Sequence, residues 1–271
     1  SFLSNPSGVM EVFAKFREYA HAGTDVILDF RAVETITPDV IPILLAKVNN
    51  YHRLINISGT KPEKKELDNL LLESGFYKMV GLSKIKSDKG FLETHKSKVV
   101  DTELAVQARK LAAEKSFGDQ DKRIQPLYRT LIECMANTHK HASDQKVHES
   151  WWLSVYNHPG TKITSFSFFD TGIGIFKSAK IEKITKFAVK LGLKSNGDVL
   201  KRILEGKITS STGLPYRGKG LPKIYSDYKA NSLKKLCIAA NDTFADFDTG
   251  TFVVLNDELN GTFLYWEISP N

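Results

Sequence analysis

The stretch that most restricts the fold is an apolar run, residues 163–169, which ends in Asp170-Thr171-Gly172-Ile173-Gly174. Isoleucine, threonine and phenylalanine in this run predict a buried strand. The strand therefore delivers one carboxylate, Asp170, to its end. Gly172 and Gly174 leave room beside that carboxylate where side chains would block a ligand. A strand followed by a glycine turn occurs in many folds, so this pattern alone indicates a site only weakly.

A helix with a polar stripe is predicted upstream, over residues 127–142. Glu133, Asn137 and His141 recur at intervals of four on a segment otherwise rich in leucine, isoleucine, methionine and alanine, and Lys140 lies beside them. Such a stripe is commonly a solvated face. An amide one turn from a carboxylate also suits magnesium and phosphate chemistry, because the amide oxygen can bind a hard cation and the carboxylate can act as a base.

A third glycine-rich stretch, Arg217-Gly218-Lys219-Gly220-Leu221, precedes a predicted helix. Backbone amides that open a helix can bind phosphate as an anion nest. A simple glycine turn explains the same residues, and this stretch by itself favours the turn.

These motifs, in this order, resemble the GHKL superfamily of Bergerat-fold ATP-binding domains, which includes gyrase, the heat-shock chaperone, histidine kinases and mismatch-repair ATPases. Glu133-x-x-x-Asn137 resembles the N box, and residues 170–175 resemble the first glycine box. Residues 218–221 resemble the second glycine box, and Gly261-Thr262 resembles the closing strand. The resemblance covers about residues 100–271, and several motifs in the right order are more specific than any one of them.

The resemblance implies ATP and Mg²⁺ as ligands and a role for each matching residue. Asp170 would accept a hydrogen bond from the adenine amino group, Thr262 would complete recognition of the base, and Asn137 would coordinate Mg²⁺. Glu133 would orient or deprotonate the attacking nucleophile as the catalytic residue. The remaining implied ATP-binding residues are glycines that admit the base and groups that neutralise phosphate: Gly172, Gly174, Lys140, His141, Arg217, Gly218, Lys219, Gly220 and Leu221. For His141, a structural role is the simpler alternative.

The sequence leaves two interpretations of what the chain does with ATP. The first interpretation is hydrolysis of ATP, or transfer of its phosphoryl group, as part of a regulatory switch between proteins. The alternative is an ATP-sensing interaction module with little or no turnover. DNA remodelling of the gyrase type is disfavoured because no room remains for a transducer domain, and no phosphoacceptor helical hairpin of the histidine-kinase type precedes the site.

The N-terminal part alternates between predicted helices and strands: helix 5–22, strand 24–30, helix 38–51, strand 54–58 and helix 62–74. This alternation predicts a small α/β unit with a parallel sheet. Over about residues 6–82 it resembles the STAS domain of anti-sigma-factor antagonists. The opening strands of that family are missing, and Asp39 stands where its phosphorylated serine would fall. The N-terminal part is therefore expected to act by docking, either within the chain, with a protein partner or in a homodimer.

The sequence thus predicts two domains, a STAS-like α/β domain with its linker over residues 1–97 and an ATP-binding domain over residues 98–271. The linker is expected within 81–98, where Lys, Ser, Asp and Gly are mixed without a regular spacing of apolar residues. The second domain is expected to be a Bergerat-type α+β layer sandwich, with a mixed sheet that carries helices on one face. Two hairpins are predicted, one joining strands 151–156 and 163–169 and the other joining strands 251–255 and 262–268. A long lid is expected over 175–217.

Composition narrows the function classes less than the motifs do. A net charge of +7 permits contact with nucleic acid, which stays an alternative, but lysines also serve a protein that holds polyphosphate. The sequence has no apolar stretch of membrane-spanning length, and we expect a cytoplasmic protein without membrane contact. Cys134 and Cys237 are the two cysteines, which argues against a disulfide scaffold.

Overall fold

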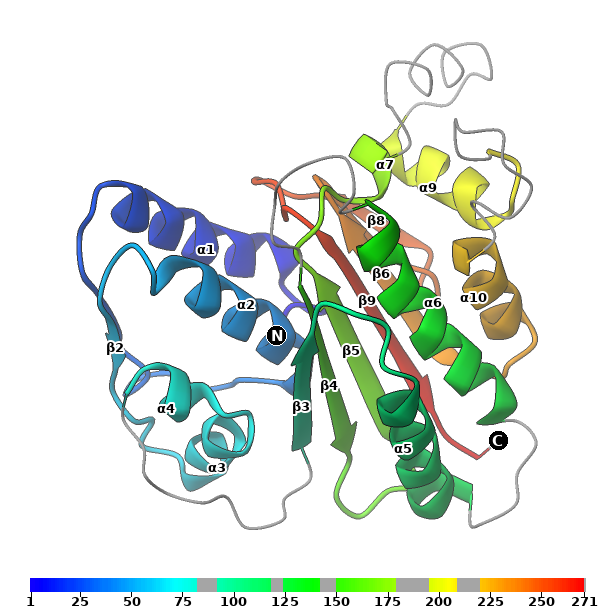
Figure 1. The fold of residues 1–271 in the computed structure, drawn as a ribbon, viewed down its shortest axis with the longest axis horizontal. Coiled ribbons are helices and arrows are strands. Elements are labelled where there is room, and N and C mark those ends of the chain that lie inside the picture. The colour runs from blue at the N-terminus through cyan, green and yellow to red at the C-terminus, as the bar shows by residue number, and fades with distance from the viewer. Residues whose placement is uncertain (82–91, 118–123, 142–149, 179–194, 209–219, 271) are drawn as a thin grey trace.

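The fold was examined in a computed structural model, which describes residues 1–81, 92–117, 124–141, 150–178, 195–208 and 220–270. Three layers make up this part of the chain (Figure 1). A seven-stranded sheet forms the middle layer, helices of the C-terminal part cover one face, and the N-terminal part covers the other. The coarse prediction of an α/β protein is confirmed.

The sheet has the strand order β3-β4-β5-β9-β6-β7-β8, and every described pair of neighbours in it is antiparallel. Its strands are β3 (Leu92–Ser97), β4 (Trp151–Asn157), β5 (Thr164–Asp170), β6 (Lys234–Ala240), β7 (Thr243–Asp246), β8 (Thr251–Val254) and β9 (Thr262–Ile268). The prediction of a mixed sheet is therefore wrong for the described strands. Two strands joined by a helical connection, as β5 and β6 are, often lie side by side and pair in parallel. In the structure, β9 lies between β5 and β6 and pairs with both in the antiparallel sense.

Two further predictions about strands need correction. The expected hairpin of strands 251–255 and 262–268 does not form, because β8 pairs with β7, a strand that the sequence analysis missed. The stretch 92–97, expected to be linker, is β3 and pairs with β4 at the edge of the sheet. The predicted hairpin of β4 and β5 is confirmed, with Trp151 opposite Asp170 and Asn157 opposite Thr164.

One face of the sheet carries the helices that follow residue 100. They are α5 (Thr102–Ala112), the π-helical turn η2 (Ala113–Phe117), α6 (Gln125–His141), α7 (Ile175–Ser178), α9 (Asn196–Leu204) and α10 (Gly220–Lys229). Asp101 caps α5, because its carboxylate accepts a hydrogen bond from the Leu104 amide at 2.8 Å. Ser195 and Asp198 form a capping box that starts α9. Residues 179–194 and 209–217 of the expected lid lie outside the described residues.

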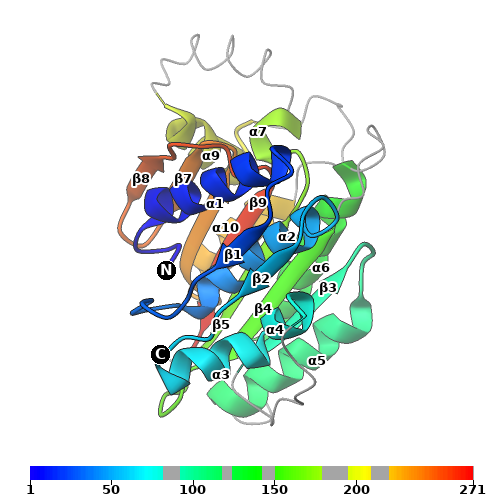
Figure 2. The same cartoon turned by 90° about the vertical axis from the view of Figure 1, so that its left-hand side faces the viewer.

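The other face is covered by the N-terminal part, which Figure 2 shows in front of the sheet. Its elements are α1 (Pro6–His21), β1 (Val26–Leu28), η1 (Pro38–Val40), α2 (Ile41–Tyr51), β2 (Ile57–Gly59), α3 (Lys65–Glu73) and α4 (Phe76–Met79). β1 and β2 pair in parallel, as predicted, and form a two-stranded sheet of their own. Gly75 has φ +78° and separates α3 from α4, in line with the predicted helix end.

Successive side chains of the central strands point to opposite faces of the sheet and pack into two separate hydrophobic cores. Phe166 and Phe168 of β5 face α5 and α6 in the first core, whereas Phe169 faces the N-terminal part in the second. β9 divides its side chains in the same way, with Leu264 in the first core and Phe263 in the second. Both faces of the central strands are therefore buried. In the described part of the chain, no helix combines the length and apolar character needed to cross a membrane.

Candidate functional site

The candidate site lies at the end of β5, where Asp170 is opposite Thr262, the first residue of β9. Both side chains are buried, at 7% exposure each. Asp170 belongs to the same face of β5 as Phe166 and Phe168, so its carboxylate lies on the side of the sheet that α6 covers. The two residues that the sequence analysis assigned to recognition of the base are thus neighbours.

The Asp170 carboxylate is a buried acceptor that several donors already orient. The Gly172 amide donates to its Oδ1 at 2.9 Å, and both the hydroxyl and the amide of Thr262 donate to it as well. Burial raises the pKa of Asp170 to about 6, while these hydrogen bonds pull the pKa in the other direction. A carboxylate in this setting is available to bind a ligand donor such as an amino group.

Gly261 is required for this arrangement, because its backbone passes directly over Asp170. Its φ is +141°, and a Cβ at this position would lie 2.0 Å from the Asp170 carbonyl oxygen. Residues with side chains cannot come this close. Gly261 therefore fixes how β9 enters the sheet and how Thr262 meets Asp170.

α6 and α10 bring the predicted N box next to the second glycine box. Glu133 and Asn137 are half-buried, and a Cβ on Gly220 would lie 2.5 Å from the Glu133 Oε2 atom and 3.4 Å from the Asn137 Nδ2 atom. Gly220 is the first residue of α10. The polar stripe of α6 thus faces the beginning of a neighbouring helix, where the partial positive charge of the helix favours a carboxylate.

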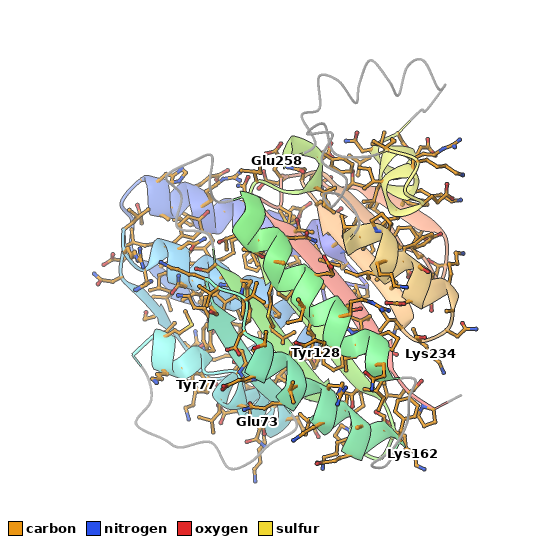
Figure 3. All side chains as sticks on the ribbon, turned by 45° about the vertical axis from the view of Figure 1, so that its right-hand side comes forward. Glu73, Tyr77, Tyr128, Lys162, Lys234 and Glu258 are labelled. Carbon is orange, nitrogen blue, oxygen red and sulfur yellow. The ribbon has the colours of Figure 1, made fainter. Side chains whose placement is uncertain are left out.

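An ion pair between the same two helices sets their alignment. The Arg129 guanidinium, one turn before Glu133, donates through Nη2 to both carboxylate oxygens of Asp227 at 2.8 Å. Lys223 adds a third charge, 3.5 Å from Asp227. Figure 3 shows α6 and α10 beside one another, with Tyr128 towards the beginning of α6. Because Arg129 meets Asp227 while Glu133 and Asn137 meet Gly220, α6 and α10 run antiparallel.

Arg129 and Asp227 were not among the site residues predicted from the sequence. Arg129 continues the spacing of four that relates Glu133 to Asn137, so the extended stripe was a signal for this residue. Asp227 could not be paired with it from sequence, because the two residues are 98 positions apart.

Several predicted site residues lie outside the described part of the chain. These are Arg217, Gly218 and Lys219, together with the side chains of Lys140 and His141. Leu221, in contrast, is described and packs against the first core as a partly buried residue of α10. Among the described residues, no group of three His, Cys, Asp or Glu side chains is placed to hold a metal ion. The amide oxygen of Asn137 is of the type that binds hard divalent cations.

Cys134 lies between the two halves of the site, on α6. It is fully buried, and burial raises the pKa of its thiol, with the charges of Asp170 and Glu133 acting in the same direction. The thiol therefore stays protonated and is a packing residue here.

The N-terminal part packs against the opposite face of the strands that carry Asp170 and Thr262. Phe2 is fully buried, and its ring meets the rings of Phe263 and Phe244 edge-on at 5.0 and 5.7 Å. Asp39 holds this segment, because its Oδ2 accepts hydrogen bonds from the amides of Phe2 at 2.6 Å and Leu3 at 3.0 Å. The carboxylate at the position where the STAS resemblance expects a serine is thus a structural clasp within the N-terminal part, which fastens the segment that carries Phe2 to η1.

Comparison with known proteins does not assign a family. No protein-family model matches the chain, and no curated protein matches its sequence.

Proposed function

We propose that the chain is a Mg²⁺-dependent ATP-binding protein of the GHKL type, with a Bergerat-type C-terminal part and a STAS-like N-terminal part. One observation carries the proposal: Asp170 and Thr262 at the strand ends, and Glu133 and Asn137 against Gly220, all belong to the same face of the sheet. Residues of four short motifs from distant parts of the sequence therefore meet in two pairs, and Cys134 is close enough to both for the charges of Asp170 and Glu133 to act on its thiol.

The residues fit an adenine nucleotide in their chemistry. Asp170 is a buried acceptor for the exocyclic amino group of the base, and Thr262 offers a hydroxyl beside it. Asn137 supplies an amide oxygen for a hard cation, and Glu133 can hold or remove a proton on an attacking oxygen. Magnesium, when bound, would offset the negative charge of the phosphates. Lys140, His141 and residues 217–219 are proposed to contact the phosphates on the sequence argument alone.

The proposed outcome of binding is a change in how the chain meets a protein partner, with ATP hydrolysed or its phosphoryl group transferred in the process. The docked N-terminal part supports a regulatory role, because Phe2 contacts Phe263, the residue next to Thr262. The same contact also supports the second candidate, an ATP sensor with little turnover. The expected site of action is the cytoplasm, where ATP is abundant.

Binding is tested by calorimetric titration of the full chain with ATP and with GTP, each with and without Mg²⁺. ATP should bind, Mg²⁺ should tighten the complex, and GTP should bind much more weakly, because its base presents a carbonyl oxygen where adenine presents the amino group. Equal affinities for ATP and GTP would remove Asp170 from base recognition. No binding of either nucleotide would refute the proposal.

Turnover is tested by measuring ADP release in two variants. Glu133→Ala should bind ATP normally but release ADP about 10²- to 10⁴-fold more slowly, because a base contributes mainly in the transition state. Asn137→Ala should weaken the Mg²⁺-dependent part of binding, because a metal ligand also stabilises the ground state. If Glu133→Ala leaves ADP release unchanged, Glu133 is not the base. If the wild type binds ATP but releases no ADP above background, the chain is an ATP sensor and the hydrolase interpretation is wrong.

A further inference from the structure

Asn241 ties the first glycine-rich loop to the turn between β6 and β7, which lies at the same end of the sheet. It is the first residue of the short turn between β6 and β7, is 4% exposed and has φ +53°. Its Nδ2 donates to the Ile173 carbonyl oxygen at 3.1 Å, and its Oδ1 accepts from the Phe176 amide at 3.2 Å. One carboxamide therefore holds the backbone on both sides of Gly174.

Gly174 and Asn241 fit each other closely. Gly174 has φ +82°, and the three heavy atoms nearest to a Cβ at this position all belong to the Asn241 side chain, with Oδ1 at 2.5 Å. The carboxamide thus occupies the space into which any side chain at position 174 would project. The second glycine of the loop is required by this contact as well as by its backbone conformation.

Asn241 is itself held firmly. The Leu259 amide donates to the Asn241 carbonyl oxygen at 2.8 Å, which links the turn to the loop before β9. Glu258, next to Leu259, lies at the same end of the molecule as α7 in Figure 3. Ala240, immediately before Asn241, pairs with Thr262, which in turn pairs with Asp170. The residue therefore stands at the point where the loop 172–176 and the ends of three central strands meet.

We infer that Asn241 is a positioning residue for the nucleotide site, which holds the loop 172–176 in the shape that leaves room for a base beside Asp170. The inference rests on the proposed function for the identity of the ligand. A loop that is ordered before the ligand arrives does not lose conformational freedom on binding, so the two hydrogen bonds of the carboxamide increase affinity without touching ATP.

The test is Asn241→Gly, because glycine adopts the same positive φ and removes only the carboxamide. Asn231→Gly is the matched control, since Asn231 is exposed and has φ +57° in the turn between α10 and β6. Asn241→Gly should weaken ATP binding tenfold or more and speed hydrogen exchange at the Phe176 amide. Asn231→Gly should change neither. Unchanged ATP affinity in Asn241→Gly would overturn the inference.

A double variant separates positioning from general loss of stability. Gly174→Ala alone should weaken ATP binding strongly, because the new methyl group collides with the carboxamide of Asn241. In the Asn241→Gly background the collision is absent, so Gly174→Ala should weaken ATP binding by a clearly smaller factor. If Gly174→Ala raises the dissociation constant by the same factor in both backgrounds, the inference is contradicted. If the wild-type chain binds no ATP, the proposed function fails, and exchange at Phe176 still decides whether Asn241 fastens the loop.

Discussion

Asp170→Asn should stabilise the ligand-free protein and weaken ATP binding at the same time. Burial raises the pKa of Asp170 from 3.8 to about 6, so the charged form is disfavoured in the folded state. Each unit of pKa shift corresponds to about 1.4 kcal/mol, which makes the penalty at pH 7 about 3 kcal/mol. The amide oxygen can still accept from Gly172, but hydrogen bonds from Thr262 become weaker. We therefore expect a net gain of about 1–2 kcal/mol in the free energy of unfolding.

The raised pKa of Asp170 also predicts how the stability of the wild type changes with pH. Between about pH 4 and 6 the folded wild type holds a proton on Asp170 that the unfolded chain has already released. This contribution to stability is present below pH 4 and is lost as the pH rises through 6. Urea denaturation of both proteins between pH 4 and 8 measures it. The advantage of Asp170→Asn should be absent at pH 4 and complete at pH 7.

The same variant should bind ATP about 30- to 1,000-fold more weakly, a loss of about 2–4 kcal/mol, because the asparagine can present a donor to a ligand amino group. Calorimetry at pH 7 measures the change. Asp227→Asn is the control for stability, since Asp227 is also buried but is paired with Arg129, and its replacement should destabilise the protein. If Asp170→Asn is less stable than the wild type at pH 7 and binds ATP equally well, the reasoning is refuted.

Three further variants test the layers around the site by denaturation. Lys47→Met should raise the free energy of unfolding at pH 7 by about 1–3 kcal/mol, because burial and the nearby Arg17 lower the pKa of Lys47 to about 8. Wild-type stability should also rise between about pH 8 and 10.5, where only the unfolded chain keeps this proton, and a flat profile would contradict the assignment. Asp39→Ala should cost about 2–3 kcal/mol, because buried amides of the N-terminal segment lose their acceptor, so an unchanged midpoint would argue against the clasp. Gly261→Ala should lower the melting temperature by about 6 °C or more, through a backbone collision worth more than about 3 kcal/mol, and near-normal melting would show that β9 can shift.

Local patterns in the sequence were sufficient to predict most of the helices and strands, and they selected the candidate site residues on α6 and at the end of β5. The spacing of Glu133 and Asn137 is a property of one helix, and the apolar run before Asp170 is a property of one strand. Periodicity therefore predicted α6 and β5 without knowledge of their neighbours. The resemblance to a known family then suggested that Thr262 lies near Asp170, and the structure has them opposite each other.

The arrangement of the sheet could not be predicted in the same way. Alternation of apolar residues identifies a strand but not the strand beside it, and β8 is as plausible a neighbour for β9 as β6 is. The place of β9 between β5 and β6 is set by contacts among residues far apart in the chain. The same holds for Asn241, whose partner Phe176 is 65 positions away. An asparagine in a short turn shows its conformational preference in the sequence, but not what its side chain binds.

Alternate residues of β5 and β9 face opposite sides of the sheet, so the number of residues in each strand decides which side chains face the candidate site. Even-numbered positions such as Asp170 and Thr262 lie on the face of the candidate site, and odd-numbered positions such as Phe169 and Phe263 lie on the face that contacts the N-terminal part. Substitution at one position alters one of these tasks and spares the other. Insertion or deletion of a single residue exchanges them, which would turn the Asp170 carboxylate towards the phenylalanine rings. The two surfaces can thus diverge independently during evolution, provided that length changes within these strands come in pairs.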